Sequence, residues 1–347
     1  MSRQLKTSDE LENTFIDERV KILLPKFEAL APYKRKQREV GVKNEDLEGW
    51  RVLATKEAAL LKSYYPDEKP ENVKEYGACL RQITALKKGL KLATKTDIKD
   101  HANYHPVNTI IAHFGNALSY LFSEYKTRQN TRYREKVESR STVENRVSLD
   151  LSPFLKYAHE ILSEIASGAS MEDVDWRDVS CAIALATGRR MAEIHLSGEF
   201  RKTGEYELGF KGQLKGKTRK IGKKKLINHE FTIPTLLSAD LVLQGIEWLD
   251  ANGKRFPRDE DPERVNRTYS KRFNGKDGIV RENWEILPEG MTYHKFRGAY
   301  FRACVVNAKV DPLDYLNFAR SILGDRDEIT IRAYQRFEIK PGSLTKI

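Results

Sequence analysis

The stretch of sequence that decides the fold is residues 187–200, TGRRMAEIHLSGEF. Gly188 belongs to a turn that leads into a helix, so we expect Arg190 near the N-terminus of that helix. A helix N-terminus and a guanidinium both favour a phosphate group, so this stretch predicts a phosphate-binding corner. Taken alone, the tetrapeptide at its start is also compatible with an ordinary turn that carries surface arginines.

The length and charge of the chain limit what the protein can be. Its 347 residues predict two domains at about 150 residues per domain. Lys and Arg number 61 against 50 for Asp and Glu, which gives a net charge of +11. A polyanionic partner is therefore the first class of partner to test, although a basic balance also serves solubility alone.

Helical periodicity dominates the first part of the chain, residues 1–125. Apolar residues step by three and four along 73–90 and again along 107–125, as on one face of an amphipathic helix. Pro25 is expected to kink or end an earlier helix. We predict a helical domain here and a second domain over 148–347.

Two basic segments are candidates for contacts with a phosphate backbone. The first is a polar stretch at 126–147, where the apolar periodicity stops and where we expect the interdomain linker. The second is the turn region between a strand at 206–210 and its expected partner at 226–233. The candidate DNA-binding residues in these two segments are Arg128, Arg132, Arg134, Lys217, Arg219, Lys220, Lys223 and Lys224. From 257 to 288 the composition is charged and punctuated by Gly and Pro, which predicts a partly ordered insertion.

Several classes of protein lose their usual sequence support. The chain contains no GxxxxGK[ST], GxGxxG, HExxH or GxSxG motif. Its three cysteines show no spacing suited to zinc, so we expect small core residues in a reducing compartment and no metal site. The N-terminus carries no apolar signal region and no run is long enough to span a membrane, so we expect a cytoplasmic protein without a membrane partner.

Four elements in the second half together carry chemistry, although each is weak alone. They are Arg190, Lys215 at the basic hairpin, the HxxR pair of His294 and Arg297, and Tyr334, which lies nine residues after Asp325. The HxxR spacing places an imidazole and a guanidinium on one face of a helical turn. A lysine can give a proton to a leaving oxygen if its pKa is lowered. A tyrosine can act as a nucleophile.

The order of these residues resembles that of the tyrosine recombinases and type IB topoisomerases, over residues 147–337. The longer string at 187–200 is similar to the hairpin telomere resolvases, or protelomerases, in which a GRRM-x-EI segment is followed by GEF. In that family a Gly-Gln-small-Lys stretch, here residues 212–215, carries the hairpin lysine.

The resemblance implies a mainly α fold of the α+β class. A helical DNA-binding or clamp domain at 1–125 would precede a tyrosine-recombinase-like catalytic domain at 148–347 that contains a small antiparallel sheet. The resemblance also implies that Tyr334 attacks a scissile phosphate and forms a 3′-phosphotyrosine, with no metal or ATP. Arg190 and Arg297 would hold the non-bridging oxygens, Lys215 would protonate the leaving oxygen and His294 would assist. The implied substrate is double-stranded DNA with an inverted repeat, such as a replicated telomere, which a homodimer would convert to hairpin ends in a bacterial nucleoid or a phage-infected cell.

One departure from the superfamily pattern leaves alternatives open. Asp325 stands where the superfamily usually has histidine or tryptophan, and a carboxylate repels a phosphate unless it is protonated or turned toward an arginine. Asp325 is therefore a candidate whose role the sequence leaves undecided. The alternatives are a conventional tyrosine recombinase or integrase, which differs in its product, and a non-catalytic DNA-binding protein.

Overall fold

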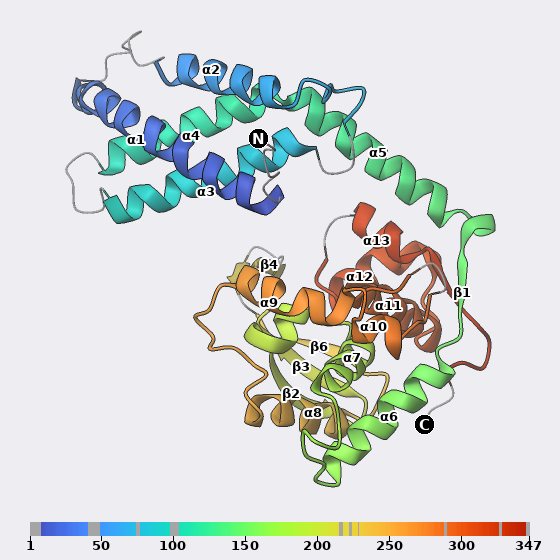
Figure 1. Cartoon of the computed structure of the whole chain (residues 1–347). Coiled ribbons are helices and arrows are strands. Elements are labelled where there is room, and N and C mark those ends of the chain that lie inside the picture. The colour runs from blue at the N-terminus through green and yellow to red at the C-terminus, as the bar shows by residue number, and fades with distance from the viewer. Residues whose placement is uncertain are drawn as a thin grey trace, which may run out of the picture. The chain divides into compact units, whose positions relative to one another are not determined.

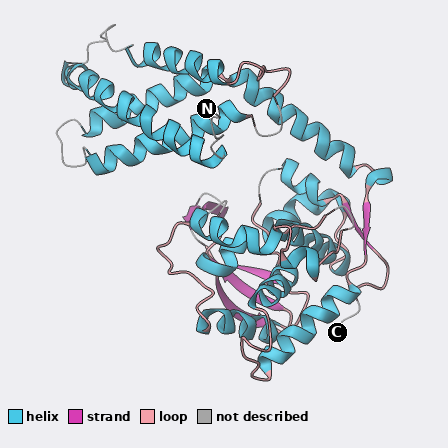
Figure 2. Ribbon diagram, in the orientation of Figure 1, coloured by secondary structure: helices cyan, strands magenta, loops and turns pink. Residues whose placement is uncertain are grey.

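The chain folds into two compact units, residues 1–135 and 136–347. The computed structural model describes residues 8–40, 49–73, 77–97, 104–214, 218–221, 224–227, 229–287, 290–325 and 328–344. Figures 1 and 2 show that helices make up most of both units and that the strands lie in the second. The predicted fold class, mainly α with a small antiparallel sheet, is confirmed.

The first unit is a bundle of helices around its own apolar core. The helices are α1 (Ser8–Val40), α2 (Gly49–Tyr64), α3 (Ala78–Asp97), α4 (Tyr104–Leu121) and α5 (Ser123–Ser141), which continues into the second unit. The predicted periodicity of 73–90 and 107–125 holds, because Leu86, Leu90, Phe114 and Leu118 are fully buried in this core. Helix α1 runs through Pro25, so the proline does not end the helix, which was one of the two expected effects.

The segment expected as the interdomain linker, 126–147, is helical over most of its length. Helix α5 extends to Ser141, and the boundary between the two units falls within it at 135/136. The segment contains neither Gly nor Pro, and its Lys, Arg, Glu and Gln residues are good helix formers. Arg128, Arg132 and Arg134 are exposed on this helix.

The second unit is built around α7 (Trp176–Thr187), in which every residue but one is buried. Its other elements are η2 (Val143–Asn145), α6 (Ser152–Ala166), the π-helix η3 (Glu193–Ser197), α8 (Ala239–Ala251), α9 (Pro262–Asn274), α10 (Ile279–Glu282), η4 (Tyr293–Lys295), α11 (Phe296–Asn307), η5 (Pro312–Asp314), α12 (Tyr315–Ile322) and α13 (Glu328–Tyr334). Helices α6, α8 and α11 pack against α7. Cys181 and Cys304 are buried in this unit, and Cys79 is buried in the first, as expected of small core residues.

Two antiparallel sheets and one parallel pair contain the strands of the described residues. The main sheet has the order β2-β3-β6, with β2 at Glu199–Gly204, β3 at Glu207–Lys211 and β6 at Phe231–Pro234. The predicted strand pairs with the end of its expected partner, with Leu208 opposite Ile233, whereas the start of that partner, residues 226–227, belongs to a different strand. The basic stretch between them forms a hairpin of its own, β4 (Thr218–Ile221) with β5 (Lys224–Ile227). The short β1 (Val147–Leu149) pairs in parallel with β7 (Phe337–Ile339).

The described part of the segment 257–288, residues 257–287, is an integral part of the core, so the expectation of a partly ordered insertion was wrong. Within it, α9 and the residues around α10 bury Val265, Phe273, Ile279 and Trp284 almost completely. Indole Nε1 of Trp284 donates to the buried carboxylate of Asp178 at 2.7 Å. The charged residues of α9 occupy its outer face, which lowered the mean hydropathy and concealed the apolar face.

Candidate active site

Arg190 is held where α7 ends. Gly188, at the C-terminus of α7, has a left-handed φ of 65°, and a Cβ there would lie 2.2 Å from a ring carbon of Tyr300. Only glycine therefore fits this turn. Arg190 follows and donates from NH1 to Glu193 Oε1 at 2.9 Å, while its backbone N–H donates to Glu193 Oε2 at 3.0 Å.

Glu193 is the buried anion that orients Arg190. Its side chain is completely buried in η3. Burial alone would raise its pKa, but the positive charges of Arg297 and Arg190 outweigh that effect and leave the pKa lowered. Glu193 is therefore ionised and fixes the guanidinium on one side, which leaves the other side to face the centre of the site.

Arg297 comes from the start of α11 and is almost fully buried, with 1% of its surface exposed. Its NH1 donates to the carbonyl of Gly188 at 2.7 Å and its NH2 donates to the carbonyl of Leu323 at 2.7 Å. These bonds tie the start of α11 to the end of α7 and to the segment after α12. The remaining edge of the guanidinium faces Asp325, with Nε 3.0 Å from Oδ2.

Asp325 lies at the centre of the site. Oδ1 accepts a bond of 2.6 Å from Arg190 NH2, and Oδ2 accepts bonds of 3.0 Å from Arg297 Nε and from the Tyr334 hydroxyl. Burial would raise its pKa, but Arg297 and Arg190 together hold it well below its usual range. A carboxylate thus draws two arginines and a tyrosine toward one point.

Tyr334 ends α13 and is 5% exposed. Burial raises the pKa of its phenol to about 12, an effect that Arg297 opposes and Asp325 reinforces. The pairing of β7 with β1 fixes the chain just beyond it, where Val147 N–H donates to the Arg336 carbonyl at 2.9 Å. Phe337 also packs on Gly298 of α11, so the helix that carries Arg297 and the helix that carries Tyr334 are locked together.

This geometry agrees with a comparison of the chain with protein families. A model of the telomere resolvase ResT/TelK catalytic domain matches residues 145–337, more than half of the chain. The chain belongs to the telomere resolvase family.

Two curated relatives support this assignment over part of their length. The chain is 28% identical over 222 residues to the protelomerase of Escherichia phage N15, and 26% identical over 222 residues to that of Klebsiella oxytoca phage phiKO2. Each match covers 58% of this chain, and 33% and 32% of the respective relatives. The matched region thus corresponds to about a third of the relatives' length.

Solved structures show the same fold over nearly the whole chain. The selenomethionine form of protelomerase TelA, covalently complexed with substrate DNA, matches with a TM-score of 0.59 at 16% identity. A TelA variant, also covalently complexed with substrate DNA, matches with a TM-score of 0.61 at 15% identity. Both matches cover 94% of each chain. The telomere resolvase fold thus extends beyond the region that the family model matches.

Four of the predicted site residues meet in the structure: Arg190, Arg297, Asp325 and Tyr334. His294 is exposed in η4, three residues before Arg297. Lys215, Lys217 and Lys223 lie outside the described residues, so their predicted roles stay predictions. Arg219 and Lys220 belong to strand β4, and Lys224 belongs to strand β5.

Three residues near the site have roles that the sequence interpretation missed. Glu193 orients Arg190, and its spacing of three residues on a helix was the available signal. Arg189 is fully buried, and its NH2 donates to the Ile322 carbonyl at 2.7 Å. Gln213 packs on Gly324 and donates to the Leu323 carbonyl at 3.3 Å. Of the adjacent arginines, only Arg190 contacts the carboxylate of Asp325.

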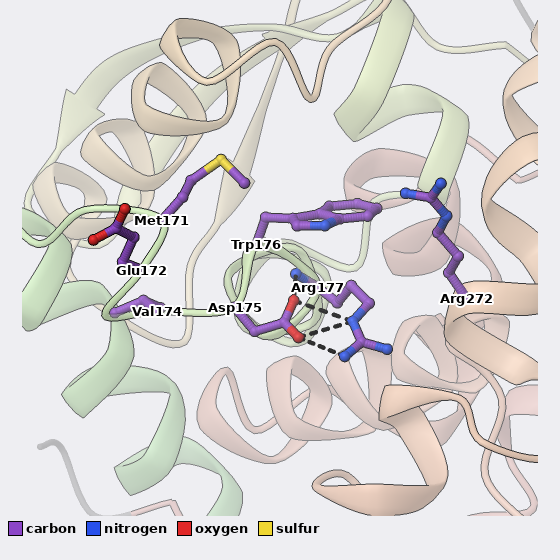
Figure 3. Close-up of a pocket in the computed structure, with 7 residues that line it drawn as sticks. All are labelled: Met171, Glu172, Val174, Asp175, Trp176, Arg177 and Arg272. Carbon is purple, nitrogen blue, oxygen red and sulfur yellow. Dashed lines mark hydrogen bonds and ion pairs between the residues drawn. The ribbon is translucent and has the colours of Figure 1, made fainter.

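A pocket of about 570 Å³ lies at the opposite end of α7 from Arg190. Figure 3 shows its lining residues, among them Trp176 with Arg272 beside it and an Asp175–Arg177 ion pair. It contains none of the four converging residues.

Among the described residues, no group of three or more His, Cys, Asp and Glu side chains is arranged to hold a metal ion. The described helices also include none with the length and apolar character of a membrane span.

Proposed function

We propose that this protein is a telomere resolvase, which cleaves and rejoins palindromic double-stranded DNA and leaves covalently closed hairpin ends. The observation that carries the proposal is the convergence of Arg190, Arg297 and Tyr334 within hydrogen-bonding distance of one anionic group, the Asp325 carboxylate. A phosphodiester is the anion that fits this arrangement: two guanidinium groups can bind its oxygens while a nucleophile lies close enough to attack its phosphorus. Family membership supports the same reaction.

Cleavage in this proposal is a transesterification at phosphorus. Tyr334 Oη attacks the scissile phosphate, the bond to the 5′-oxygen breaks, and a 3′-phosphotyrosine forms while the phenol proton passes to solvent water. Lys215 supplies a proton to the leaving 5′-oxygen, and His294 assists through a hydrogen bond to the phosphate. Arg190 and Arg297 stabilise the negative charge that grows on the non-bridging oxygens.

Rejoining reverses these steps on a different strand. The 5′-hydroxyl of the complementary strand attacks the phosphotyrosine and returns a proton to Lys215. The bond from phosphorus to Tyr334 Oη breaks, and the phenolate takes up a proton from solvent water. Because the phosphotyrosine retains the energy of the phosphodiester bond, the proposed reaction uses no ATP. The guanidinium and ammonium groups supply the positive charge, so we also propose that it uses no metal ion.

The proposed partner is duplex DNA with an inverted repeat, such as a replicated telomere, bound by a homodimer. Two strands must be cut and each joined to its complement, so two copies of the single tyrosine site account for the product. The exposed Arg128, Arg132 and Arg134 of α5 are proposed phosphate contacts. We propose the bacterial cytoplasm as its location, because such DNA would be found there.

The test uses DNA with candidate inverted-repeat sites, incubated in EDTA with the wild-type protein and with Tyr334→Phe. We expect the wild type alone to give products that snap back after heating on a denaturing gel. Recombined circles or Holliday junctions would instead indicate a conventional recombinase. Binding to a verified site without any covalent adduct, even on a nicked substrate that traps intermediates, would refute the proposed enzymatic activity.

A further inference from the structure

The Asp325 carboxylate occupies the place in the site that a phosphate would need. Its two oxygens accept bonds from both arginines, and one of them also accepts the bond from Tyr334. Two non-bridging oxygens of a scissile phosphate would have to meet the same guanidinium groups, with phosphorus within reach of the same phenol oxygen. The two anions cannot hold these donors at once.

Arg297 makes this conflict most severe. Its NH1 and NH2 are bonded to the carbonyls of Gly188 and Leu323, and NH2 also lies 3.0 Å from Asp325 Oδ2. The edge that carries Nε faces Asp325, and the side chain is 1% exposed. Arg297 therefore binds a phosphate with this edge only when the carboxylate has moved away.

The surroundings of Asp325 confine that movement to the carboxylate and the chain beside it. The carbonyls of Ile322 and Leu323 are anchored by Arg189, Arg297 and Gln213. Gly324, with a left-handed φ of 71°, separates this anchored backbone from Asp325. The carboxylate can thus rotate out while the carbonyl contacts of Arg297 stay in place.

A role as proton acceptor for Tyr334 fits the site less well. Two arginines hold the pKa of Asp325 well below its usual range, so the carboxylate has little affinity for a proton. The buried Glu193 balances only one of the two positive charges of Arg190 and Arg297, and both guanidinium groups are largely withdrawn from water, so loss of the second anion would leave a charge unbalanced. An anion is needed there whether or not DNA is bound.

We propose that Asp325 is an internal stand-in for the scissile phosphate: it holds Arg190, Arg297 and Tyr334 assembled in the DNA-free protein and leaves when the phosphate takes its place. The identity of the displacing anion as a DNA phosphate rests on the proposed function. The existence of a site for a phosphate-like anion, at the position that the Asp325 carboxylate now occupies, does not depend on the proposed function. Asp325 is accordingly a positioning residue, and it makes the protein select for an anion that can compete with a carboxylate.

The first experiment needs no DNA. Thermal unfolding of the wild type, Asp325→Asn and Asp178→Asn is followed as inorganic phosphate replaces chloride at constant ionic strength. Asp178 is the matched control, because it is a buried carboxylate that accepts hydrogen bonds from the neutral groups of Tyr157, Asn283 and Trp284. We expect a phosphate-dependent rise in Tm for Asp325→Asn alone, since only that variant frees two arginines for an added anion.

An equal response of Asp325→Asn and the control would overturn the proposal, and so would a rise in the wild type as large as that in Asp325→Asn. A variant that fails to fold in chloride but folds in phosphate supports it. If Asp325→Asn does not fold in either salt, Asp325→His provides the same test with a side chain that is common at this position in the superfamily.

The second experiment uses DNA, with Tyr334→Phe in every arm so that the strand stays uncleaved. We expect Asp325→Asn to bind a duplex with a normal scissile phosphate about tenfold more tightly than its parent, which corresponds to about 1.4 kcal/mol. The gain should shrink on a duplex with a neutral methylphosphonate at that position. An equal gain on both duplexes would contradict displacement by the phosphate.

Cleavage kinetics separate this proposal from proton acceptance. With Tyr334 intact and DNA limiting, displacement predicts faster cleavage by Asp325→Asn, whereas loss of a general base would slow it about 10²–10⁴-fold. If the phosphate effect on Tm appears but no DNA cleavage occurs at any site, the proposed function fails and the anion site stands. If cleavage occurs without the phosphate effect, the inference about Asp325 fails alone.

Discussion

Arg297 and Asp325 form a buried ion pair, 3.0 Å between Nε and Oδ2, that joins the start of α11 to the segment before α13. The pair brings a guanidinium from the HxxR motif to a carboxylate that also holds the Tyr334 hydroxyl. Residues 28 positions apart in the sequence thus set the distance between the phosphate-binding group and the nucleophile.

Replacing Arg297 by alanine should damage both stability and chemistry. We expect single-turnover cleavage to fall about 10²–10³-fold, as on removal of one donor to a developing negative charge. The free energy of unfolding should fall by about 3–5 kcal/mol, because Asp325 loses a partner within the core. Urea unfolding and quenched-flow cleavage measure the two effects.

Arg190→Ala is the comparison for that variant. Its side chain is 14% exposed, and its removal costs Glu193 its ion pair. Asp325 keeps Arg297, however, and the buried carbonyls of Gly188 and Leu323 keep their donor. We expect a similar loss of cleavage with a smaller loss of stability. Equal stability losses in the two variants would contradict the central position of the Arg297 pair.

Gly188→Ala should be far more costly than an ordinary change at a left-handed glycine. A Cβ at Gly188 meets the buried ring of Tyr300 at 2.2 Å, whereas Gly253 has the same φ of 65° and nothing within 4 Å. We expect Gly253→Ala to cost about 1 kcal/mol of unfolding free energy and Gly188→Ala clearly more. Chemical denaturation of both variants decides, and equal costs would argue against the tight turn.

The stability of the protein should fall on acidification, in part through His195. Its Nδ1 faces the Lys254 carbonyl at 2.8 Å and its Nε2 faces Ser180 Oγ at 2.7 Å, and burial lowers its pKa from 6.5 to about 4. Between these values the unfolded chain binds a proton that the folded protein does not. Stability is therefore lost as the pH falls through this window, by up to about 1.4 kcal/mol per pH unit.

His195→Gln isolates that contribution. The variant should be less stable at pH 7 because the buried contacts change, but its unfolding free energy should fall less steeply between pH 6.5 and 4. Urea titrations of both proteins across this range give the two slopes. Parallel slopes would show that His195 titrates normally in the folded state.

The arginines of α5 should contribute to DNA affinity without sequence preference. For Arg128→Ala combined with Arg134→Ala, we expect the slope of log affinity against log salt to decrease by about 0.9 per lost phosphate contact. Lys91→Ala with Lys95→Ala, a change of equal charge on α3 of the same unit, should have a smaller effect. Equal effects would mean that only net charge matters.

Sequence patterns predicted the helices and strands that have a clear apolar face better than they predicted where each helix or strand begins and ends. The helical periodicity around Leu86 and Phe114 and the alternation through Leu208 correspond to buried faces in the structure, because burial is what such patterns report. The helix through 126–141 was missed because a solvated helix has no apolar stripe. The buried face of α9 was missed because its few apolar residues stand among many charges.

The sequence predicted which residues form the site, but it did not predict that Asp325 lies at the centre of the site. The order of Arg190, Arg297 and Tyr334 was sufficient to group them, because it resembles a known arrangement. The placement of Asp325 between all three depends on side-chain directions and on the left-handed Gly324, which no sequence spacing reveals. Likewise, only the structure distinguishes the buried Arg189 from Arg190, which faces the site.

The most direct test of the account is to identify the residue that becomes attached to DNA. The protein is incubated with a nicked inverted-repeat substrate that traps the intermediate, digested with protease and nuclease, and analysed by mass spectrometry. The account predicts a nucleotide adduct on the peptide that contains Tyr334, linked through a 3′-phosphate, and no adduct with Tyr334→Phe. An adduct on another residue, or one that persists in Tyr334→Phe, would contradict it.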